Sequence, residues 1–475
     1  MGEFRFRLPD DWNPSVSQSR SIHVIGLDGI PAPCRVSVND GILSVVRNQD
    51  DSGKVFITWP FEDFGEITVG TGTLPESDEP YRLVVELARG TLNRLRNQIS
   101  IWREGGLKVD VSVDQQISSA TKLLSEAIMD AGAEGSERDA RESLRIAMAG
   151  NFNLGHQFGA EISKFRISQQ DFPRFWIANA VAKNLTGPEN YSTPQFHLVQ
   201  VRPEQAEAAA AIDDKRMIVG PFLDASPGGM EPEIVELDDF LARKDFILNR
   251  CRKVIRQLNP AASLLHVVSG LNGMGHRRLS YPQQTQITSE MLNLIDESQV
   301  EVPMMVSFDY PWGERLASAV GGAHPIQIAD SLMRQGSNVS FIGLDINLDF
   351  WPCGSVVRDP LQWIDMIDIW SQLGLPLIIL LRMPSGKPPE KSLLDESENP
   401  TNEIRSAMTD QQRLFFLEKV IPMLIARPTV HGLVWRQWGD EDDPRFPGSG
   451  LAQANGEFKP VIESIGKATK VLTAS

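Results

Sequence analysis

The sequence predicts a multidomain α/β protein with a C-terminal (β/α)8 TIM barrel, preceded by a small β-sandwich and a helical subdomain. Three observations support this prediction. Short alternating apolar runs fill residues 1–78, longer runs at helical spacing follow in 79–168, and strand-like and helix-like segments then alternate through 169–475. Such alternation is typical of parallel βα units, and about 300 residues accommodate one barrel with insertions.

The first segment contains short strand-like runs separated by turn signals such as Asp28-Gly and Asn39-Asp-Gly. Apolar and polar residues that alternate between such turns are typical of a small β-sandwich. Two roles stay open for this domain: binding of a glycan, as in a carbohydrate-binding module, and capping of the domain that follows. The runs are Phe4–Leu8, Ile22–Ile25, Cys34–Val38, Ile42–Val46 and Lys54–Trp59.

The second segment changes period. Apolar residues recur at helical spacing over Leu83–Trp102, Ile117–Ala131 and Ser136–Met148. This spacing predicts helices that pack on one another as a subdomain.

The third segment supplies eight apolar runs for the eight strands of one barrel. A polar stretch, Ser385–Asn402, follows the seventh run and is interpreted as a long loop over the carboxyl-end face, either a lid or a disordered segment. The runs are Phe175–Asn179, Phe196–Val201, Arg216–Gly220, Leu264–Ser269, Met304–Phe308, Phe341–Ile346, Leu375–Leu381 and His431–Trp435.

Charge and composition narrow the classes of partner. The chain has 46 Lys and Arg against 62 Asp and Glu, a net charge of −16, which disfavours nucleic acid. No run approaches the roughly 18 apolar residues that a membrane span needs. The N-terminus lacks the apolar core of a secretory signal, and the three cysteines are far apart, so we expect a cytoplasmic protein. We expect no cofactor and no metal. The sequence leaves open whether the protein forms a homo-oligomer.

The last predicted strand leads into a group of aromatic, amide and carboxylate side chains, Trp435, Gln437, Trp438 and Asp440. At the carboxyl end of a barrel strand such groups suit a sugar, because flat rings stack on pyranose faces while polar groups bind hydroxyls. The alternative is a buried strand whose tryptophans pack in the core.

The last five strands resemble those of the family 10 glycoside hydrolases, which are xylanase-type retaining barrels. The segment 307–310 resembles that family's Asn-Asp-Tyr strand, and 341–346 resembles its Ile-Gly-Met-Gln strand. The segment 375–383 resembles the strand that carries the nucleophile, and 433–460 resembles the closing Trp and Lys-Pro segment. The resemblance implies a carbohydrate-active barrel that acts on an oligosaccharide or polysaccharide.

The family's two catalytic glutamates have no counterpart in this chain. The place of the acid/base reads Val268-Ser269-Gly270, and that of the nucleophile reads Leu380-Leu381. Pro221 replaces the family's histidine on the third strand. A Leu cannot form a covalent glycosyl ester, and a Gly cannot donate a proton. The family's hydrolytic chemistry through these two positions is therefore excluded.

Other carboxyl groups follow the predicted strands. We expect Asp345 and Asp309 to form a relocated catalytic pair, with Glu314 as a third candidate, because glycoside hydrolysis needs two carboxyl groups beside the bond. The alternative is that these acids cap helices or pair with arginines. The candidates for substrate binding are Asp224, Asn272, His276, Arg277, Tyr310, Trp312, Asn347, Arg382, Trp435, Gln437 and Asp440.

The sequence therefore favours a glycoside hydrolase with a relocated carboxylate pair. A catalytically inactive barrel that binds glycan or serves as a scaffold is the alternative, because a fold alone does not fix a function.

Overall fold

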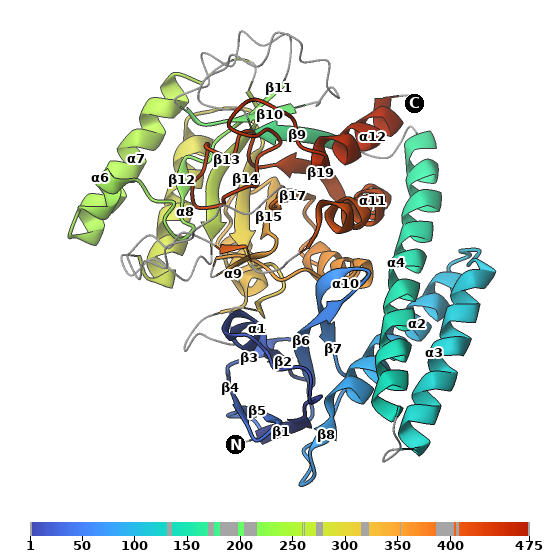
Figure 1. Cartoon of the computed structure of the whole chain (residues 1–475). Coiled ribbons are helices and arrows are strands. Elements are labelled where there is room, and N and C mark those ends of the chain that lie inside the picture. The colour runs from blue at the N-terminus through green and yellow to red at the C-terminus, as the bar shows by residue number, and fades with distance from the viewer. Residues whose placement is uncertain are drawn as a thin grey trace.

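The computed structural model describes residues 2–130, 135–169, 175–180, 198–203, 216–258, 260, 262–271, 279–314, 323–351, 353–385, 403–404 and 408–473. In Figure 1 the chain begins in a small two-sheet domain, continues through three long helices and ends in a barrel surrounded by helices. The predicted α/β fold with a C-terminal barrel is confirmed, and the two N-terminal sheets fit the predicted sandwich.

Eight parallel strands form the barrel: β9 (Trp176–Ala180), β10 (Leu198–Val201), β11 (Arg216–Val219), β13 (Ala262–Leu271), β14 (Met304–Asp309), β15 (Phe341–Asn347), β17 (Leu377–Arg382) and β19 (Val430–Trp435). Each overlaps one predicted strand. Their order is β11-β10-β9-β19-β17-β15-β14-β13, and the pairing of β11 with β13 closes the ring. The short strand β12 (Leu223–Asp224) lies beside β13.

The interior of the barrel changes from apolar to polar along the strands. An apolar cluster fills it with Ala178, Ile218, Leu264, Met305, Ile378, Leu380 and Val434. Two residues further along their strands stand His266, Ser307, Arg382 and Arg436. Because strand side chains alternate with a period of two, these polar residues also face inward. The polar end is the carboxyl end of the strands, where barrel proteins build their sites.

Helices cover the outside of the barrel (Figure 1). They are α6 (Pro232–Val235), α7 (Phe240–Arg256), α8 (Tyr281–Glu297), α9 (Pro325–Arg334), α10 (Pro360–Ser371), α11 (Asp410–Ala426) and α12 (Val461–Thr473). A small antiparallel pair, β16 (Phe350–Trp351) and β18 (Glu403–Ile404), lies beyond β15. Most of the predicted loop after the seventh strand, residues 386–402, lies outside the described residues.

Three helices precede the barrel: α2 (Leu83–Glu104), α3 (Val111–Met129) and α4 (Ser136–Ser168). The prediction ended the third helix at Met148, but α4 continues for a further 20 residues to Ser168. Its continuation contains glycines, which are poor helix formers but allow close packing. A Cβ on Gly159 would lie 2.7 Å from the Met423 backbone nitrogen of α11. Tertiary packing against the barrel therefore outweighs the weak local propensity.

The N-terminal domain consists of two four-stranded sheets. It also contains a short helix, α1 (Val16–Ser21), and contacts the barrel near α10. The Thr68 backbone N–H donates to the Val357 carbonyl at 2.8 Å, and the Gln362 side chain donates to the Thr68 carbonyl at 2.6 Å. One sheet contains β4 (Cys34–Asn39), β5 (Ile42–Arg47), β1 (Gly2–Arg7) and β8 (Tyr81–Arg82), and the other contains β3 (Pro31–Ala32), β2 (His23–Ile25), β6 (Lys54–Phe61) and β7 (Gly65–Gly70).

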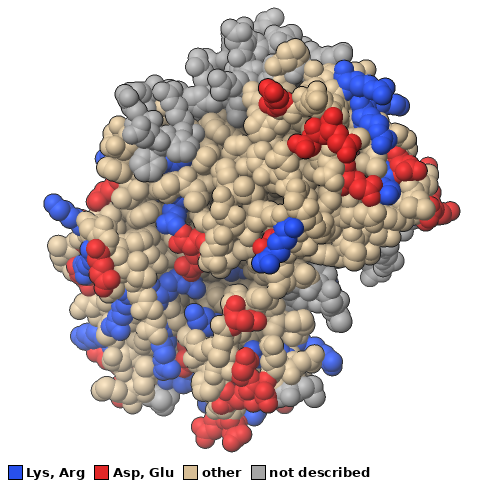
Figure 2. All heavy atoms as spheres, turned by 180° about the vertical axis from the view of Figure 1, so that it is seen from behind, with Lys and Arg blue, Asp and Glu red and all other residues tan. Residues whose placement is uncertain are grey.

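The surface seen in Figure 2 carries basic and acidic side chains interspersed among uncharged ones. Among the helices that the structure describes, none combines the length and the apolar character that a membrane crossing requires.

The close contact between α4 and α11 predicts the effect of a single methyl group. Gly159→Ala improves helix propensity, but its Cβ meets the backbone of Pro422 and Met423. We expect a loss of roughly 1–3 kcal/mol in the free energy of unfolding, which is typical of overpacking. Ser119→Ala on the exposed face of α3 is the control and should be neutral or stabilising. Denaturant unfolding measures both. A stabilised Gly159→Ala protein would contradict the described packing.

Candidate functional site

Two aspartates lie side by side at the carboxyl end of β14 and β15. Asp309 and Asp345 are direct partners in the register of these parallel strands. Neighbouring strands lie about 4.8 Å apart, so the two carboxyl groups are held close together. Both stand on the inward face, Asp309 four residues after Met305 of the apolar interior cluster. The side chains are 4% and 2% exposed, respectively. The structure thus brings together the two aspartates singled out from the sequence.

Asp345 is held by three side chains. Arg436 donates from Nη1 to Oδ1 at 2.5 Å, which forms a buried ion pair. Oδ2 accepts from the Ser269 hydroxyl at 3.2 Å and from the Ser307 hydroxyl. Charge-assisted hydrogen bonds of this kind stabilise the carboxylate form. Asp345 is therefore fixed in position by β13, β14 and the residue that follows β19.

A hydrogen-bonded chain extends from Asp345 across the barrel interior. His266 Nε2 lies 2.9 Å from Ser307 Oγ, and His266 Nδ1 lies 2.9 Å from Gln200 Nε2. Burial, followed by the charge of Arg436, lowers the pKa of His266 to about 3, so the ring is neutral at ordinary pH. Because the Asp345 carboxylate only accepts, Ser307 donates to it, His266 Nε2–H donates to Ser307, and Gln200 donates to His266 Nδ1.

The surroundings of Asp309 favour its protonated form. Burial, together with repulsion by Asp345 and Asp224, raises its pKa well above the usual range for an aspartate. The carboxyl group makes no hydrogen bond or ion pair to another described residue. A carboxyl group that favours its protonated form therefore stands beside a carboxyl group that is paired with an arginine, and two carboxyl groups in such different surroundings are suited to acid and base roles.

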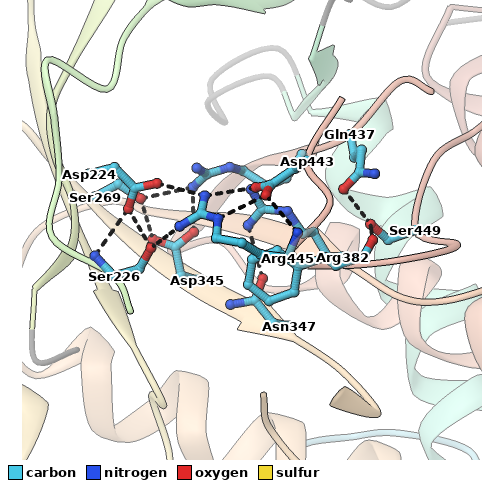
Figure 3. A network of polar contacts seen from close by, with 12 residues as sticks. Asp224, Ser226, Ser269, Asp345, Asn347, Arg382, Gln437, Asp443, Arg445 and Ser449 are labelled. Carbon is cyan, nitrogen blue, oxygen red and sulfur yellow. Dashed lines mark hydrogen bonds and ion pairs between the residues drawn. The ribbon is translucent and has the colours of Figure 1, made fainter. Parts of the chain in front are cut away.

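A second polar network adjoins the first (Figure 3). Arg445 donates to both oxygens of Asp443 at 2.8 Å, and its Nη2 also contacts Asp224 at 2.9 Å. Arg382 bridges Asp443 at 3.1 Å and the Asn347 amide oxygen at 3.0 Å. The network joins β12, β15 and β17 to the loop after β19.

Burial and charge act against one another in this network. Burial opposes ionisation of Asp224, but Arg445 and the hydrogen bonds from Ser226 outweigh it and hold the pKa of Asp224 well below its usual range. The pKa of Asp443 is lowered in the same way, since Arg445 and Arg382 outweigh burial. Burial, reinforced by Arg436, lowers the pKa of Arg382 to about 10. These groups form compensated ion pairs at neutral pH.

A cavity opens above this network at the carboxyl ends of β9, β10 and β11. Arg382 and Arg436 line it, as do Asp224, Asp443 and Arg445. Arg436 is shared, because the same guanidinium group lines the cavity and contacts Asp345. Arg436 therefore lies between the cavity and the buried Asp345.

The three sequence candidates at the end of β19 and after it have different surroundings. Gln437 lines the cavity, although its amide oxygen accepts from Ser449 at 2.7 Å. Asp440 pairs with Lys459 at 2.6 Å. Trp435 is completely buried, and its indole N–H donates to the Ser449 carbonyl at 2.9 Å.

Two of the candidates after β14, Trp312 and Glu314, lie beside Arg358, which shortly precedes α10. The Trp312 indole donates to the Gln362 carbonyl at 3.2 Å, and Arg358 lies over its ring at 5.1 Å. Glu314 interacts electrostatically with Arg358, and its carboxyl oxygens are buried without a hydrogen bond to a described residue. Tyr310 is buried immediately after Asp309 with a φ of 53°. The candidates Asn272, His276 and Arg277 lie outside the described residues.

Sequence reasoning missed much of this site. The sequence analysis gives no role to Arg436, His266 and Ser307, although each carries a signal: a polar side chain two residues after one that faces the apolar interior. Because alternate side chains of a strand share one face, Arg436, two residues after the inward-facing Val434, is expected to face the barrel interior as well. Arg445 and Asp443 lie in a loop, where no periodicity predicts which side chains meet.

No family model matches the sequence, and no curated protein matches it. Among solved structures the chain is similar to xylanase 10B from Thermotoga maritima, with 12% identity over 66% of this chain and 99% of that chain and a TM-score of 0.47. An endo-1,4-beta-xylanase from Caldicellulosiruptor owensensis gives 13% identity, coverages of 62% and 96%, and a TM-score of 0.44. Xylanase 10B from Thermotoga petrophila RKU-1, solved in complex with xylobiose, is 10% identical over 66% of this chain and 97% of that chain, with a TM-score of 0.43.

The strand topology and the side chains define the class of this protein independently of those similarities. It is a parallel α/β barrel with a buried pair of carboxyl groups and a charged cavity at the carboxyl end of its strands.

The ion pair between Arg436 and Asp345 yields a stability prediction. Arg436→Met leaves Asp345 buried without its counter-charge, and we expect a loss of about 3–5 kcal/mol in the free energy of unfolding. Arg436→Met combined with Asp345→Asn should recover part of this loss, because the uncompensated charge is gone. The matched control is Lys467→Met, which breaks an exposed pair with Glu418 and should cost at most about 1 kcal/mol. Equal losses in the two single variants would rule out a buried, coupled pair.

Proposed function

We propose that this protein is a glycoside hydrolase that acts on an oligosaccharide or polysaccharide with Asp309 and Asp345 as its two reacting carboxyl groups. The observation that carries the proposal is the register pairing of a protonated Asp309 with an ion-paired Asp345 at the carboxyl end of the barrel. Glycoside hydrolysis requires such a division between an acid and a carboxylate.

The proposed roles follow from the surroundings of each group. Asp309 gives its proton to the glycosidic oxygen as the bond between that oxygen and the anomeric carbon breaks. The Asp345 carboxylate, held by Arg436 and two hydroxyl groups, stabilises the positive charge that develops at the anomeric carbon. Water supplies the hydroxyl group of the new reducing end, and its remaining proton restores Asp309.

The chain of His266 and Ser307 supports this division of roles. Ser307 donates its only proton to Asp345, and neutral His266 fixes the direction of that hydrogen bond. The carboxylate is thereby kept in one orientation, which favours a pre-organised site.

A specific observation favours a second candidate, a barrel that binds glycan without turnover. Asp345 and Asp309 are only 2% and 4% exposed, and the residues that line the described cavity include Arg436 but neither aspartate. If Arg436 keeps its position over Asp345 when a saccharide is bound, the cavity binds the ligand and no bond is broken.

Substitution of the acid separates the two candidates. We expect Asp309→Asn to lower the rate of hydrolysis by about 10²- to 10⁴-fold, which is the usual contribution of a general acid. The assay is release of reducing ends from a panel of oligosaccharides and aryl glycosides. Asp245→Asn on the exposed part of α7 is the control and should retain full activity. Turnover that survives both Asp309→Asn and Asp345→Asn would exclude this pair, and binding without turnover by the native protein would support the second candidate.

The raised pKa of Asp309 also predicts a pH dependence of stability. The folded state keeps a proton that the unfolded chain loses above about pH 4, so Asp309 reduces stability as pH rises from there toward its folded pKa. Asp309→Asn removes this cost. We therefore expect Asp309→Asn to melt at a higher temperature than the native protein at pH 7, and the two melting temperatures to converge near pH 4. A lower melting temperature for Asp309→Asn at pH 7 would show that Asp309 is ionised and paired in the folded protein.

A further inference from the structure

The cavity beside the aspartate pair is lined by side chains of two kinds. Its apolar lining, called here the apolar wall, includes Pro221, Phe222, Met230 and Ile234. Its polar lining, called here the polar wall, includes Gln200, Arg382 and Arg436. A pyranose ring has the matching character, with C–H groups on its faces and hydroxyl groups around its edge.

The polar wall presents both a donor and an acceptor that lack partners among the described residues. The Gln200 amide oxygen and the Arg382 Nε are buried without a hydrogen bond, and Gln200 and Arg382 are 3% and 6% exposed. Arg436 uses only Nη1 in its hydrogen bonds to described residues. Unpaired buried polar groups are costly, so this wall favours a ligand that can both donate and accept. A hydroxyl group does both.

Among the described residues, the charged groups around the cavity are paired with one another. Its lining residues pair Arg445 with Asp224 and Asp443, and Arg250 with Glu231. Arg436 pairs with Asp345 below, and Arg202 interacts electrostatically with Asp442. The described lining therefore contains five arginines and four carboxyl groups, Asp224, Glu231, Asp442 and Asp443, and Arg436 has a further carboxyl partner in Asp345 outside the lining. A buried anion would add a charge without a counter-charge, which is strongly unfavourable.

We infer that this cavity is a binding subsite for an uncharged sugar unit of the saccharide chain. The inference deepens the proposed function and rests on it for the class of ligand. The apolar wall packs against the C–H face of the ring. A sugar hydroxyl donates to the Gln200 oxygen, while Arg382 Nε and the free edge of Arg436 donate to sugar oxygens. The arginines here bind hydroxyl groups, not a carboxylate or sulfate, because the neighbouring aspartates already neutralise them.

Direct binding measurements test the subsite. The probes are four neutral trisaccharides, xylotriose, cellotriose, mannotriose and galactotriose, and the anionic trisaccharide trigalacturonate, titrated calorimetrically into the Asp309→Asn protein. We expect at least one neutral trisaccharide to bind, with an affinity that changes less than about 2-fold between 50 mM and 500 mM salt, and trigalacturonate to bind at least 10-fold more weakly.

Variants test the residues. Gln200→Leu removes the unpaired acceptor and should weaken the neutral trisaccharide about 3- to 10-fold, the effect of one lost hydrogen bond. The matched control is Gln284→Leu, which changes another buried glutamine with an unpaired amide oxygen, on α8 away from the cavity. Met230→Ala shortens the apolar wall, leaves the contact between Gln200 and His266 intact, and should also weaken binding. Circular dichroism verifies that each variant is folded.

The outcomes separate this inference from the proposed function. Tighter binding of trigalacturonate, no binding by any neutral probe, or an equal effect of Gln200→Leu and Gln284→Leu would overturn the subsite. The subsite would also be overturned if the native protein hydrolyses a sugar whose affinity is unchanged by both Gln200→Leu and Met230→Ala. That result would leave the proposed catalytic role of the aspartate pair standing. Neutral binding that depends on Gln200, with no turnover, would support the subsite and refute hydrolysis.

Discussion

The Arg436 guanidinium lies against the Asp345 carboxylate inside the mouth of the barrel, where both side chains are more than nine-tenths buried. Charges in such a place are stable only when they are paired and hydrogen-bonded. Among the described residues of the mouth, three buried or largely buried arginines pair with three aspartates, and Asp309 is a fourth acid that pairs with none of these arginines. Burial and the neighbouring carboxylates therefore raise the pKa of Asp309, and the same charge balance that stabilises the barrel mouth gives two neighbouring carboxyl groups different surroundings.

This balance depends on the register of the strands. Direct pairing of Asp309 with Asp345 places both at one level, and a shift of one residue would turn one of them outward. Gly343 stands two residues before Asp345 on the same face, and a Cβ there would lie 2.5 Å from the Ser307 Cβ. The absence of a side chain at Gly343 leaves room for Ser307, which links His266 to Asp345. Backbone geometry and hydrogen bonding thus support the same arrangement.

The sequence could predict the barrel because each predicted strand is an apolar run of five to seven residues bounded by polar segments. It could also predict that Asp309 and Asp345 lie at the ends of adjacent strands. It could not predict which acid is charged, because that depends on Arg436, which approaches from β19 across the barrel. The sequence analysis treats Trp435, Gln437, Trp438 and Asp440 as one sugar-binding group. Because strand side chains alternate between two faces, Trp435 points away from the barrel interior and Arg436 points toward it. The length of α4 was underestimated because its glycines signal a helix end locally, whereas here they allow contact with α11.

The two places where the resemblance to family 10 leads one to expect catalytic glutamates both adjoin Asp345. Ser269 donates to its carboxylate at 3.2 Å, and Leu380 is its partner in the register of β17. A glutamate at either place would put a second negative charge beside a buried carboxylate, and like charges at such distances cannot both ionise at low cost. A hydroxyl group and an aliphatic side chain instead leave Asp345 as the carboxylate between the two positions, with Arg436 as its counter-charge. Ser269 and Leu380 at these two places are therefore compatible with a charged Asp345 between them, whereas a glutamate at either place would compete with Asp345 for its counter-charge, Arg436.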